Sequence, residues 1–371
     1  MSDLITMEAP CMFGLESLVA DELRMMGAEQ VAPQNGRVLF YGDKNLLARA
    51  NICSRYSERI LVLLGSFPAD SFETLFEGTK ACEWERWIGV LDAFPVKGKA
   101  VDSQLYSIPD CQKIIKKAVV ERLKTKYRTA WFEERGQVYQ IQFLIRKDVA
   151  SLYLDTSGPS LHKRGYRALS AGAPIKETLA AAMAGLARIR DYSSVVDPFC
   201  GSGTILIEAA LLAHNIAPGL RRPFAAEQWA IDASVWQQER QRARDQIKQT
   251  ALFEAQGYDI DAQAVELTRE NAKKAGVGTS IKAACGDVTA FSMNAEQVLI
   301  TNPPYGERLL DLDHARELYR TLGKKFKAGG SKKAFVISPD DTFEVCFGKE
   351  ADKKRKLYNG MMPCQLYQYF R

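Results

Sequence analysis

The sequence contains few of the residues that build metal sites. Its 371 residues include only three histidines, and its eight cysteines form no C-x-x-C pair; they stand at positions 11, 53, 82, 111, 200, 285, 346 and 364. A structural zinc site needs clustered Cys and His ligands, and a disulfide framework needs a regular cysteine spacing. We therefore expect no metal and no disulfides, and a reduced, cytoplasmic protein.

Long apolar runs are also missing. The segment Ile60–Leu64 is one of the longest, whereas a helix that crosses a bilayer takes roughly 20 apolar residues. The first residues include the acids Asp3 and Glu8 and no basic stretch, so no secretory signal peptide is expected. A chain of 371 residues, 46% of them hydrophobic, can build two or three domains. We expect a multidomain chain without a membrane span.

Positive charge is concentrated in one part of the chain. The window Lys97–Arg128 holds nine basic and three acidic residues and is therefore +6, so within a total of +5 the remainder is near −1. A basic face of this kind is expected of a protein that holds a phosphate backbone, although an ordinary solvated face would look the same. The candidate RNA-binding residues in this window are Lys97, Lys99, Lys113, Lys116 and Lys117.

The segment Val195–Thr204, VVDPFCGSGT, predicts a buried strand that enters a glycine-rich turn and then a helix. Gly201 and Gly203 allow a tight turn and a close approach of a ligand to the backbone. No Gly-Lys-Ser/Thr closes the turn, so it is not a phosphate loop. The acid Asp197 at the strand end suits a ligand with a cationic end and polar, unphosphorylated groups. A purely structural strand-to-helix turn would also fit.

A second polar cluster, Asn302-Pro303-Pro304-Tyr305, follows a short apolar run. The two prolines remove two backbone donors, so carbonyl groups face outward without competing N–H groups. Asn302 adds a side-chain carbonyl and Tyr305 a flat ring. Such a cluster can accept both hydrogens of a planar exocyclic amine while the ring stacks on the base. We expect the Tyr305 hydroxyl to be incidental.

Together the two motifs, DPFCGSGT and NPPY, resemble those of the amino-methyltransferases that use S-adenosylmethionine. More narrowly, NPPYGERL and the segment Ala217–Trp229, APGLRRPFAAEQW, resemble the THUMP-domain guanine-N2 RNA methyltransferases. The resemblance covers essentially the whole chain. It implies an α/β fold: a Rossmann-like class I methyltransferase domain over 158–371, preceded by a ferredoxin-like region over 1–60 and a THUMP RNA-binding domain over 61–157, both α+β.

The cofactor implied by this resemblance is S-adenosyl-L-methionine. An acid at the end of the second strand binds ribose hydroxyls in doubly wound folds, which favours Asp259 over Asp261, the expected cap of the next helix. The resemblance places Asp287 against the adenine amine, and a helix over 175–189, able to begin at Pro174, near the methionine end. The candidate cofactor-binding residues are Asp197, Pro198, Gly201, Gly203, Thr204, Asp259, Ile260, Asp287, Val288 and Thr178.

The chemistry demands little covalent work, because the sulfonium methyl is already activated and has only to be aligned with the attacking nitrogen. Guanine N2 is a poor nucleophile, and the carbonyls of Asn302 and Pro303 can localise its lone pair by accepting the two N–H bonds. The proton can leave to water, so no histidine base is expected nearby. A thiolate role for Cys200 is disfavoured, since it lies inside the cofactor turn. The candidate catalytic residues are Asn302, Pro303, Pro304 and Tyr305.

The stretch 158–172 is expected to join the two halves. Its basic-aromatic string His162–Arg167 fits contact with phosphate and a base, and it fits equally well a docked linker held by tyrosine packing. The candidate RNA contacts here are Lys163, Arg164 and Arg167. Upstream, Cys111–Lys126 predicts a helix capped by Asp110, with its lysines largely off the apolar stripe. Downstream, Ser234–Lys248 predicts a highly charged, solvent-facing helix.

Three functions remain open. The resemblance favours methylation of guanine N2 in RNA, with 23S ribosomal RNA ahead of transfer RNA. A second function is methylation of adenine N6 or of a protein glutamine by the same fold. A third is an RNA-binding protein that no longer catalyses, which the retention of both motifs argues against. The expected partner is RNA, with no membrane and no metal, and the oligomeric state, monomer or weak dimer, stays open.

Overall fold

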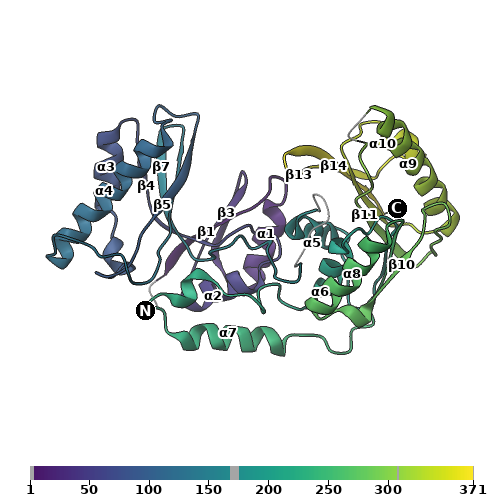
Figure 1. Ribbon diagram of the computed structural model, residues 1–371, viewed down its shortest axis with the longest axis horizontal. Coiled ribbons are helices and arrows are strands. Elements are labelled where there is room, and N and C mark those ends of the chain that lie inside the picture. Colours follow the sequence, from purple (N-terminus) through teal and green to yellow (C-terminus); the bar gives the residue numbers. More distant parts are fainter. Residues whose placement is uncertain (1–3, 168–174, 307–308, 371) are drawn as a thin grey trace.

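The computed structural model describes residues 4–167, 175–306 and 309–370 (Figure 1). It contains two seven-stranded sheets, one built from the first 155 residues and one from the C-terminal half. In Figure 1 the first sheet extends from β5 and β7 at the left to β1 and β3 in the middle of an elongated molecule, and the second sheet lies at the right. The predicted helix start at Pro174 lies outside the described residues.

The first sheet has the order β2-β3-β1-β4-β7-β6-β5. Its strands are β1 (Ile5–Pro10), β2 (Glu29–Gln34), β3 (Arg37–Gly42), β4 (Leu61–Pro68), β5 (Val96–Val101), β6 (Ile141–Arg146) and β7 (Val149–Asp155). The pairing of β1 with β4 makes the sheet continuous across the expected boundary near residue 60. The division into three domains at residues 60 and 157 therefore stays a prediction, since hydrogen bonding does not stop at the first of these positions.

Four helices accompany this sheet: α1 (Glu16–Met25), α2 (Lys44–Cys53), α3 (Phe72–Ala81) and α4 (Ile108–Tyr127), with a short 3-10 turn at Trp84–Arg86. The predicted cap of α4 is wrong. The helix begins at Ile108, Ser107 takes the cap position, and Asp110 lies within the first turn, where its carboxylate accepts a hydrogen bond from the Ser107 hydroxyl. A proline in the first turn lets the helix start earlier than the apolar stripe suggests.

The second sheet has the order β10-β9-β8-β11-β12-β14-β13. Its strands are β8 (Ser194–Asp197), β9 (Glu254–Asp259), β10 (Ile281–Cys285), β11 (Gln297–Thr301), β12 (Ala334–Ser338), β13 (Lys353–Asn359) and β14 (Met362–Tyr369). β8 to β12 pair in parallel, and the β13–β14 hairpin closes the sheet in antiparallel fashion. The predicted α/β class, a mostly parallel sheet with a closing hairpin, is confirmed.

The helices of this half are α5 (Glu177–Leu186), α6 (Thr204–Ala213), α7 (Ala233–Asp245), α8 (Ala262–Ala275), α9 (Leu309–Gly329) and α10 (Phe343–Phe347), with 3-10 turns at Ala225–Gln228 and Gly278–Ser280. α6 is buried on almost every side, as its continuous apolar sequence predicts. No helix among the described residues is long and apolar enough to cross a membrane.

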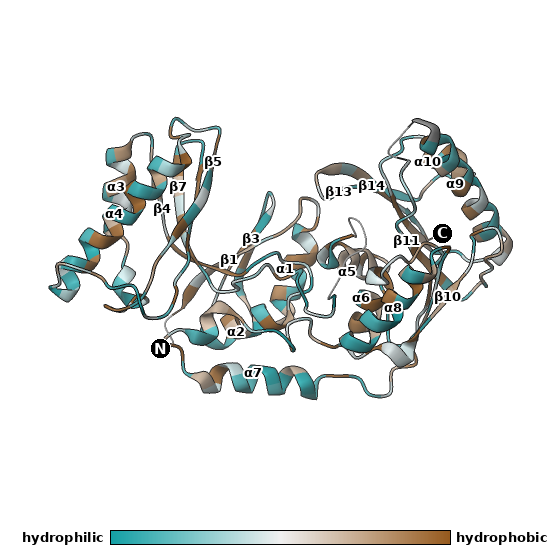
Figure 2. Cartoon of the chain, in the orientation of Figure 1, coloured by the Kyte–Doolittle hydropathy of each residue, from teal (hydrophilic) through white to brown (hydrophobic). Residues whose placement is uncertain are grey.

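The prediction that α7 faces solvent is wrong on one side. Trp236 and Glu239 are buried because α7 packs against α2 of the first half, beneath which it lies in Figure 1. Arg49 of α2 makes two hydrogen bonds, of 2.6 and 2.8 Å, to the carboxylate of Glu239. Figure 2 shows the mixture of hydrophilic and hydrophobic residues along α7. One face of this charged helix therefore packs against the first half. We call the segment 217–248, which contains α7, the arm.

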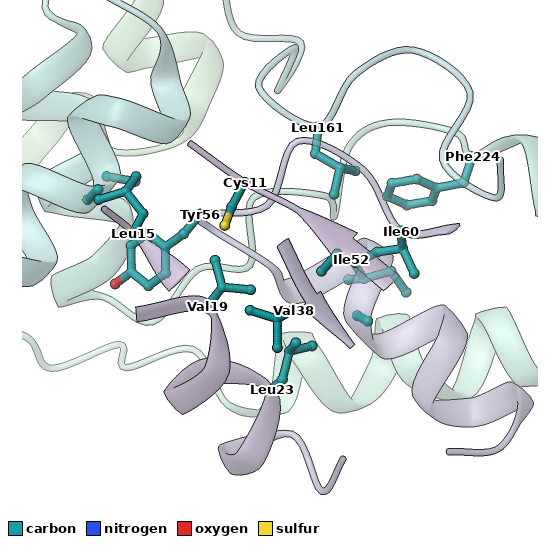
Figure 3. Packing of buried hydrophobic residues seen from close by; sticks show 14 of the residues in the cluster. Cys11, Leu15, Val19, Leu23, Val38, Ile52, Tyr56, Ile60, Leu161 and Phe224 are labelled. Carbon is teal, nitrogen blue, oxygen red and sulfur yellow. The ribbon is translucent and has the colours of Figure 1, made fainter. Parts of the chain in front are cut away.

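One hydrophobic cluster runs through both halves of the chain. Figure 3 shows Leu161 and Phe224, from the second half, in the same cluster as Ile52 and Ile60 from the first. The junction is also held by Arg222, whose guanidinium donates to the carbonyls of Ser157, Pro159, Ser160 and Lys163. The two halves therefore share a core, and the second sheet is fixed relative to the first.

Candidate active site

A cavity of about 950 Å³ lies at the carboxyl ends of the parallel strands β8, β9, β10 and β11. Ligands of doubly wound sheets bind at this edge, because successive strand ends and their loops meet there. The cavity is lined by Lys176, Pro198, Phe199, Gly201, Asp259, Ile260, Asp287, Val288, Asn302, Pro303, Pro304, Tyr305, Gly306, Asp311, His314, Ala315, Leu318, Asn359, Gly360 and Met362. All four predicted catalytic residues and six of the ten predicted cofactor residues thus share one cavity.

The glycine-rich turn is fixed by hydrogen bonds from both sides. The backbone N–H of Gly201 donates to Asp259 over 3.0 Å, and the hydroxyl of Thr268 donates to the carbonyl of Gly201 over 2.7 Å. Gly203 has φ +79°, and a Cβ there would come within 2.7 Å of Thr268. A Cβ on Gly201 would meet nothing within 4 Å. The turn therefore leaves open space for a ligand at Gly201 and is closely packed at Gly203.

Asp197 ends β8, as predicted, but its side chain does not line the cavity. Its buried carboxylate accepts hydrogen bonds from the Thr301 hydroxyl (2.6 Å) and the Phe199 amide (3.1 Å), and burial raises its pKa to about 7. Asp197 therefore ties the end of β8 to the end of β11 beneath the cavity. Gly203 and Thr204 also lie outside the cavity lining. In this structure the three residues lie behind the lining and support the turn, and their predicted contact with the cofactor stays a prediction.

Thr178 is also absent from the cavity lining. It is 1% exposed, and its hydroxyl donates to the carboxylate of Glu58 over 2.7 Å, across the junction with the first half. Lys176, two residues earlier, lines the cavity instead. Burial opposes ionisation of Glu58, but hydrogen bonds from His162 and Thr178 and the nearby Lys176 ammonium outweigh it and bring the pKa of Glu58 to about 2. The helix predicted to lie near the methionine end of the cofactor thus reaches the cavity through Lys176, the residue that precedes it.

Two carboxylates face the cavity from neighbouring strand ends. Asp259 is the last residue of β9, and its carboxylate accepts hydrogen bonds from the Gly201 and Asp261 N–H groups, both of 3.0 Å. Asp287 follows β10, and hydrogen bonding from Thr289 lowers its pKa. The prediction that Asp261 caps α8 is confirmed, because its carboxylate accepts from the amide of Gln263 over 2.8 Å. Two carboxylate acceptors thus line the cavity at the edge where ribose and adenine groups are expected.

The Asn302–Tyr305 turn is held by a chain of side-chain hydrogen bonds. The amide of Asn359, on the closing hairpin, donates to the Tyr305 hydroxyl over 3.1 Å, and that hydroxyl donates to the side-chain carbonyl of Asn302. Tyr319 of α9 donates to the Pro304 carbonyl over 2.9 Å. Burial raises the pKa of Tyr305, so it is a neutral donor. The Tyr305 hydroxyl is therefore bound on both sides, to Asn302 and to Asn359, and its expected incidental role in the reaction stays a prediction.

Two further side chains bear on the predicted chemistry. Burial raises the pKa of the Cys200 thiol well above its usual value, which agrees with the view that Cys200 is not a nucleophile. His314, on the exposed side of α9, lines the cavity, although no histidine was expected there. Its position is set by a helix that begins after the Asn302–Tyr305 turn, and no spacing in the sequence signals it. Among the described residues, no group of three or more His, Cys, Asp or Glu side chains is arranged to hold a metal ion.

The predicted RNA-binding residues do not form one face. Arg164 is 4% exposed and donates to the carbonyls of Leu161 and Arg55, so its prediction as a phosphate contact is not supported. Arg167 is paired with Glu177 over 2.9 Å. Lys163 is exposed. The string His162–Arg167 is thus largely a docked linker, the second of the two readings that its sequence allowed.

The lysines of the basic window are divided between a strand and a helix. Lys97 and Lys99 lie exposed on β5, and Lys113 and Lys117 lie exposed on α4. Lys116 is half-buried: its ammonium lies 3.6 Å from the centre of the Phe94 ring and bonds to Glu134. Burial lowers its pKa. Lys116 is therefore occupied within the fold, and Lys113 is paired with Asp110 over 3.5 Å at the surface, whereas Lys97, Lys99 and Lys117 form no ion pair within the described part of the chain.

Three known families match successive parts of the chain. Residues 164–368 match the RMKL-like methyltransferase domain, residues 6–61 the RlmL ferredoxin-like domain, and residues 69–155 the THUMP domain.

Two relatives illustrate the similarity in sequence. The chain is 42% identical to the Bacillus subtilis protein named "Putative RNA methyltransferase YpsC", over 98% of this chain and 96% of that one. It is 35% identical to the ribosomal RNA large subunit methyltransferase K/L of Syntrophotalea carbinolica, over 98% of this chain and 54% of that one. The chain thus spans about half the length of the K/L relative.

Solved structures agree with these matches. SMU.472, a methyltransferase by its name, was solved in complex with SAH; it is 39% identical, superposes with a TM-score of 0.94 and covers 100% of this chain and 99% of its own. A Listeria monocytogenes protein is 42% identical, with a TM-score of 0.94, over 99% of this chain and 96% of its own. The latter carries the name of a predicted N6-adenine-specific DNA methylase.

Proposed function

Because the chain belongs to the RMKL-like methyltransferase family, we propose that it transfers a methyl group from S-adenosylmethionine to the N2 amine of a guanosine in RNA. The observation that carries this proposal is the placement of the Asn302–Tyr305 turn in the same cavity as Asp259 and Asp287. Large-subunit (23S) ribosomal RNA is the favoured substrate, since the K/L relatives act on it by name. Transfer RNA is the alternative.

The residues that line the cavity fit the cofactor. Three acids, Asp259, Asp287 and Asp311, stand against one lysine, Lys176, among the described residues of the lining. This balance favours a ligand that carries positive charge. Asp259 would hold the ribose hydroxyls and Asp287 the adenine amine, while the open space at Gly201 admits the ligand close to the backbone.

S-adenosylmethionine supplies an activated methyl group, and the protein has to present the amine to it. The side-chain oxygen of Asn302 has two lone pairs, so it can accept from the Tyr305 hydroxyl and from the substrate amine together. The Pro303 carbonyl can accept the second N–H of the amine. As the new N–C bond forms, the amine becomes more acidic and these acceptors become more effective. The released proton passes to water or to His314 at the cavity rim.

The ferredoxin-like and THUMP matches favour RNA as the substrate. Binding of the cofactor alone would not require these two N-terminal regions. The rival function with a specific observation behind it is methylation of adenine N6, the activity in the name of the Listeria structure. Asn302 and Pro303 would accept the hydrogens of either exocyclic amine. A protein glutamine is a weaker third candidate.

The identity of the methylated nucleoside tests the proposal. Total RNA from cells with and without the gene would be digested to nucleosides and examined by mass spectrometry. We expect the amount of N2-methylguanosine to fall without the gene and to be restored by the wild-type chain but not by Asn302→Ala. Loss of N6-methyladenosine, or a methyl label on protein, would overturn the choice of substrate while leaving the cofactor assignment in place.

A further inference from the structure

We propose that a single strand of RNA next to the target nucleotide lies in a groove on the face of the first sheet opposite α4. We call this the sheet groove; it has a volume of about 720 Å³ and is lined from β1, β3, β4, β5, β6 and β7. The inference rests on the proposed function, because it names the path that the RNA substrate takes to the cavity.

The alternation of side chains along β5 and β6 decides which residues face the groove. On β5, Val96 and Ala100 pack into the core beneath α4, so Lys97, Lys99 and Val101 point to the other side. Lys99 and Val101 line the groove, and Arg146 lines it from the end of β6. The basic window of the sequence is therefore split: its strand lysines lie on the groove side of the sheet, Lys99 in the lining itself, and its helix lysines lie on the opposite side.

The groove carries a positive surplus. Four basic side chains line it, Arg37, Arg59, Lys99 and Arg146, against the two acids Glu8 and Glu58. Arg37 is paired with Glu8 over 3.4 Å, and Arg59 with Asp155. Lys99 and Arg146 are exposed, and neither forms an ion pair within the described part of the chain. These two cations are the ones that can exchange solvent counterions for phosphates.

An aromatic ring accompanies the cations. Phe13 lines the groove and is 56% exposed, and Val101 beside Lys99 is 41% exposed. Large apolar side chains at a charged surface offer a place for bases to stack, with little dependence on sequence. Bases are free to stack in this way only when they are unpaired, so the combination favours a single strand over a duplex.

The groove leads toward the catalytic cavity. Glu58 lines the groove, its carboxylate lies 3.8 Å from the ammonium of Lys176, and Lys176 lines the cavity. In Figure 1, β1 and β3 lie between β5 and β7 on one side and α5 on the other, and α5 lies near the β13–β14 hairpin. The Glu58–Lys176 ion pair thus separates the groove from the cavity. An RNA strand in the groove would lie next to the site where its neighbouring nucleotide would be methylated.

The test measures binding of a fluorescein-labelled 20-nucleotide oligouridylate to the full chain, without cofactor, over a range of salt concentrations. The groove variant is Lys99→Gln/Arg146→Gln. The rival variant, Lys113→Gln/Lys117→Gln, removes two equally exposed charges from α4, and Lys324→Gln/Lys327→Gln on α9 controls for net charge. Each single-stranded phosphate contact contributes about 0.7 to the salt slope, so the groove variant should lose about 1.4 and bind on the order of 25-fold more weakly at 0.1 M salt.

The α4 and α9 variants should change affinity by less than about threefold, since exposed charges beyond a Debye length are screened. Phe13→Ala should weaken the single strand and leave a duplex of the same length unaffected. The proposal is overturned if the α4 variant loses more affinity than the groove variant, or if the wild-type chain prefers the duplex. Because the assay involves no methyl transfer, a failed groove leaves the proposed reaction intact, and a failed reaction leaves the groove measurement valid.

Discussion

The catalytic cavity and the sheet groove are the two largest concave regions described above, and they carry opposite charge. The cavity has three carboxylates and one lysine, whereas the groove has four cationic side chains and two carboxylates. The difference matches the two ligands: a sulfonium cofactor is a cation, and an RNA strand is a polyanion. A net charge of +5 for the chain therefore says little about binding, because the informative quantity is how charge is divided between surfaces.

The largest effect should come from Asn302→Ala, which removes the acceptor for the substrate amine. Loss of one oriented group of this kind costs on the order of a hundredfold or more in rate. Calorimetry should show an unchanged affinity for the cofactor, and the oligouridylate should bind as before. Equal losses of cofactor binding and of rate would show instead that Asn302 supports the cavity as a whole.

The next largest effect should come from Asp259→Ala, which removes the carboxylate that faces the cavity and holds the Gly201 N–H. Hydrogen bonds to charged groups are worth about 1.5–3 kcal/mol, so the cofactor should bind on the order of tenfold to a hundredfold more weakly. Asp261→Ala is the matched control: it removes a neighbouring acid that only caps α8. The assignment fails if calorimetry gives the same cofactor affinity for both variants.

A smaller effect is expected from Tyr305→Phe, which deletes the link between Asn359 and Asn302 while keeping the ring. A net hydrogen bond is worth about 0.5–1.5 kcal/mol, so kcat should fall roughly two- to tenfold with KM little changed. Asn359→Ala should cause a similar loss, and the double variant should lose no more than either single one. Additive losses would mean that the two residues act separately.

The smallest functional effect, and the clearest pH dependence, should come from Asp197→Asn. Burial raises the pKa of Asp197 from 3.8 to about 7, so between these values the folded chain binds a proton that the unfolded chain does not. Stability of the wild type therefore falls as pH rises from about 4 to about 7. The side-chain amide of the variant would keep an acceptor for Thr301 and Phe199 without this penalty.

The variant should thus be more stable than the wild type above pH 7, by at most a few kcal/mol, and the difference should vanish near pH 4. Thermal unfolding without cofactor measures it. A difference that stays constant from pH 4 to pH 8 would show that Asp197 does not titrate in this range.

Sequence reasoning located the cavity because its two motifs lie at strand ends, and parallel strands bring those ends to one edge. It missed Asn359 and His314, since each comes from an element far along the chain whose approach depends on packing. It also placed Asp197 in the cavity, although the last residue of a buried strand can equally point beneath its turn. Such side-chain directions depend on tertiary neighbours and not on local pattern.

The basic window shows the same limit. Composition identified its charge, but the face on which each lysine lies follows from the two-residue period of β5 and the separate period of α4. Lys97 and Lys99 were thereby separated from Lys113 and Lys117. The buried side of α7 was missed for a related reason: few apolar residues suffice when the partner surface, on α2, supplies the rest.

The arm formed by residues 217–248 has a consequence for how the chain is made. α2 lies near the N-terminus, yet its partners Phe224, Trp236 and Glu239 follow the whole of the first sheet. At a synthesis rate of about 5–20 residues per second, the roughly 90 residues from Ser157 to Lys248 take roughly 5 to 20 s to emerge. During that interval the nascent first half exposes the surface that α7 later covers. A chaperone that binds this surface would therefore act before α7 emerges.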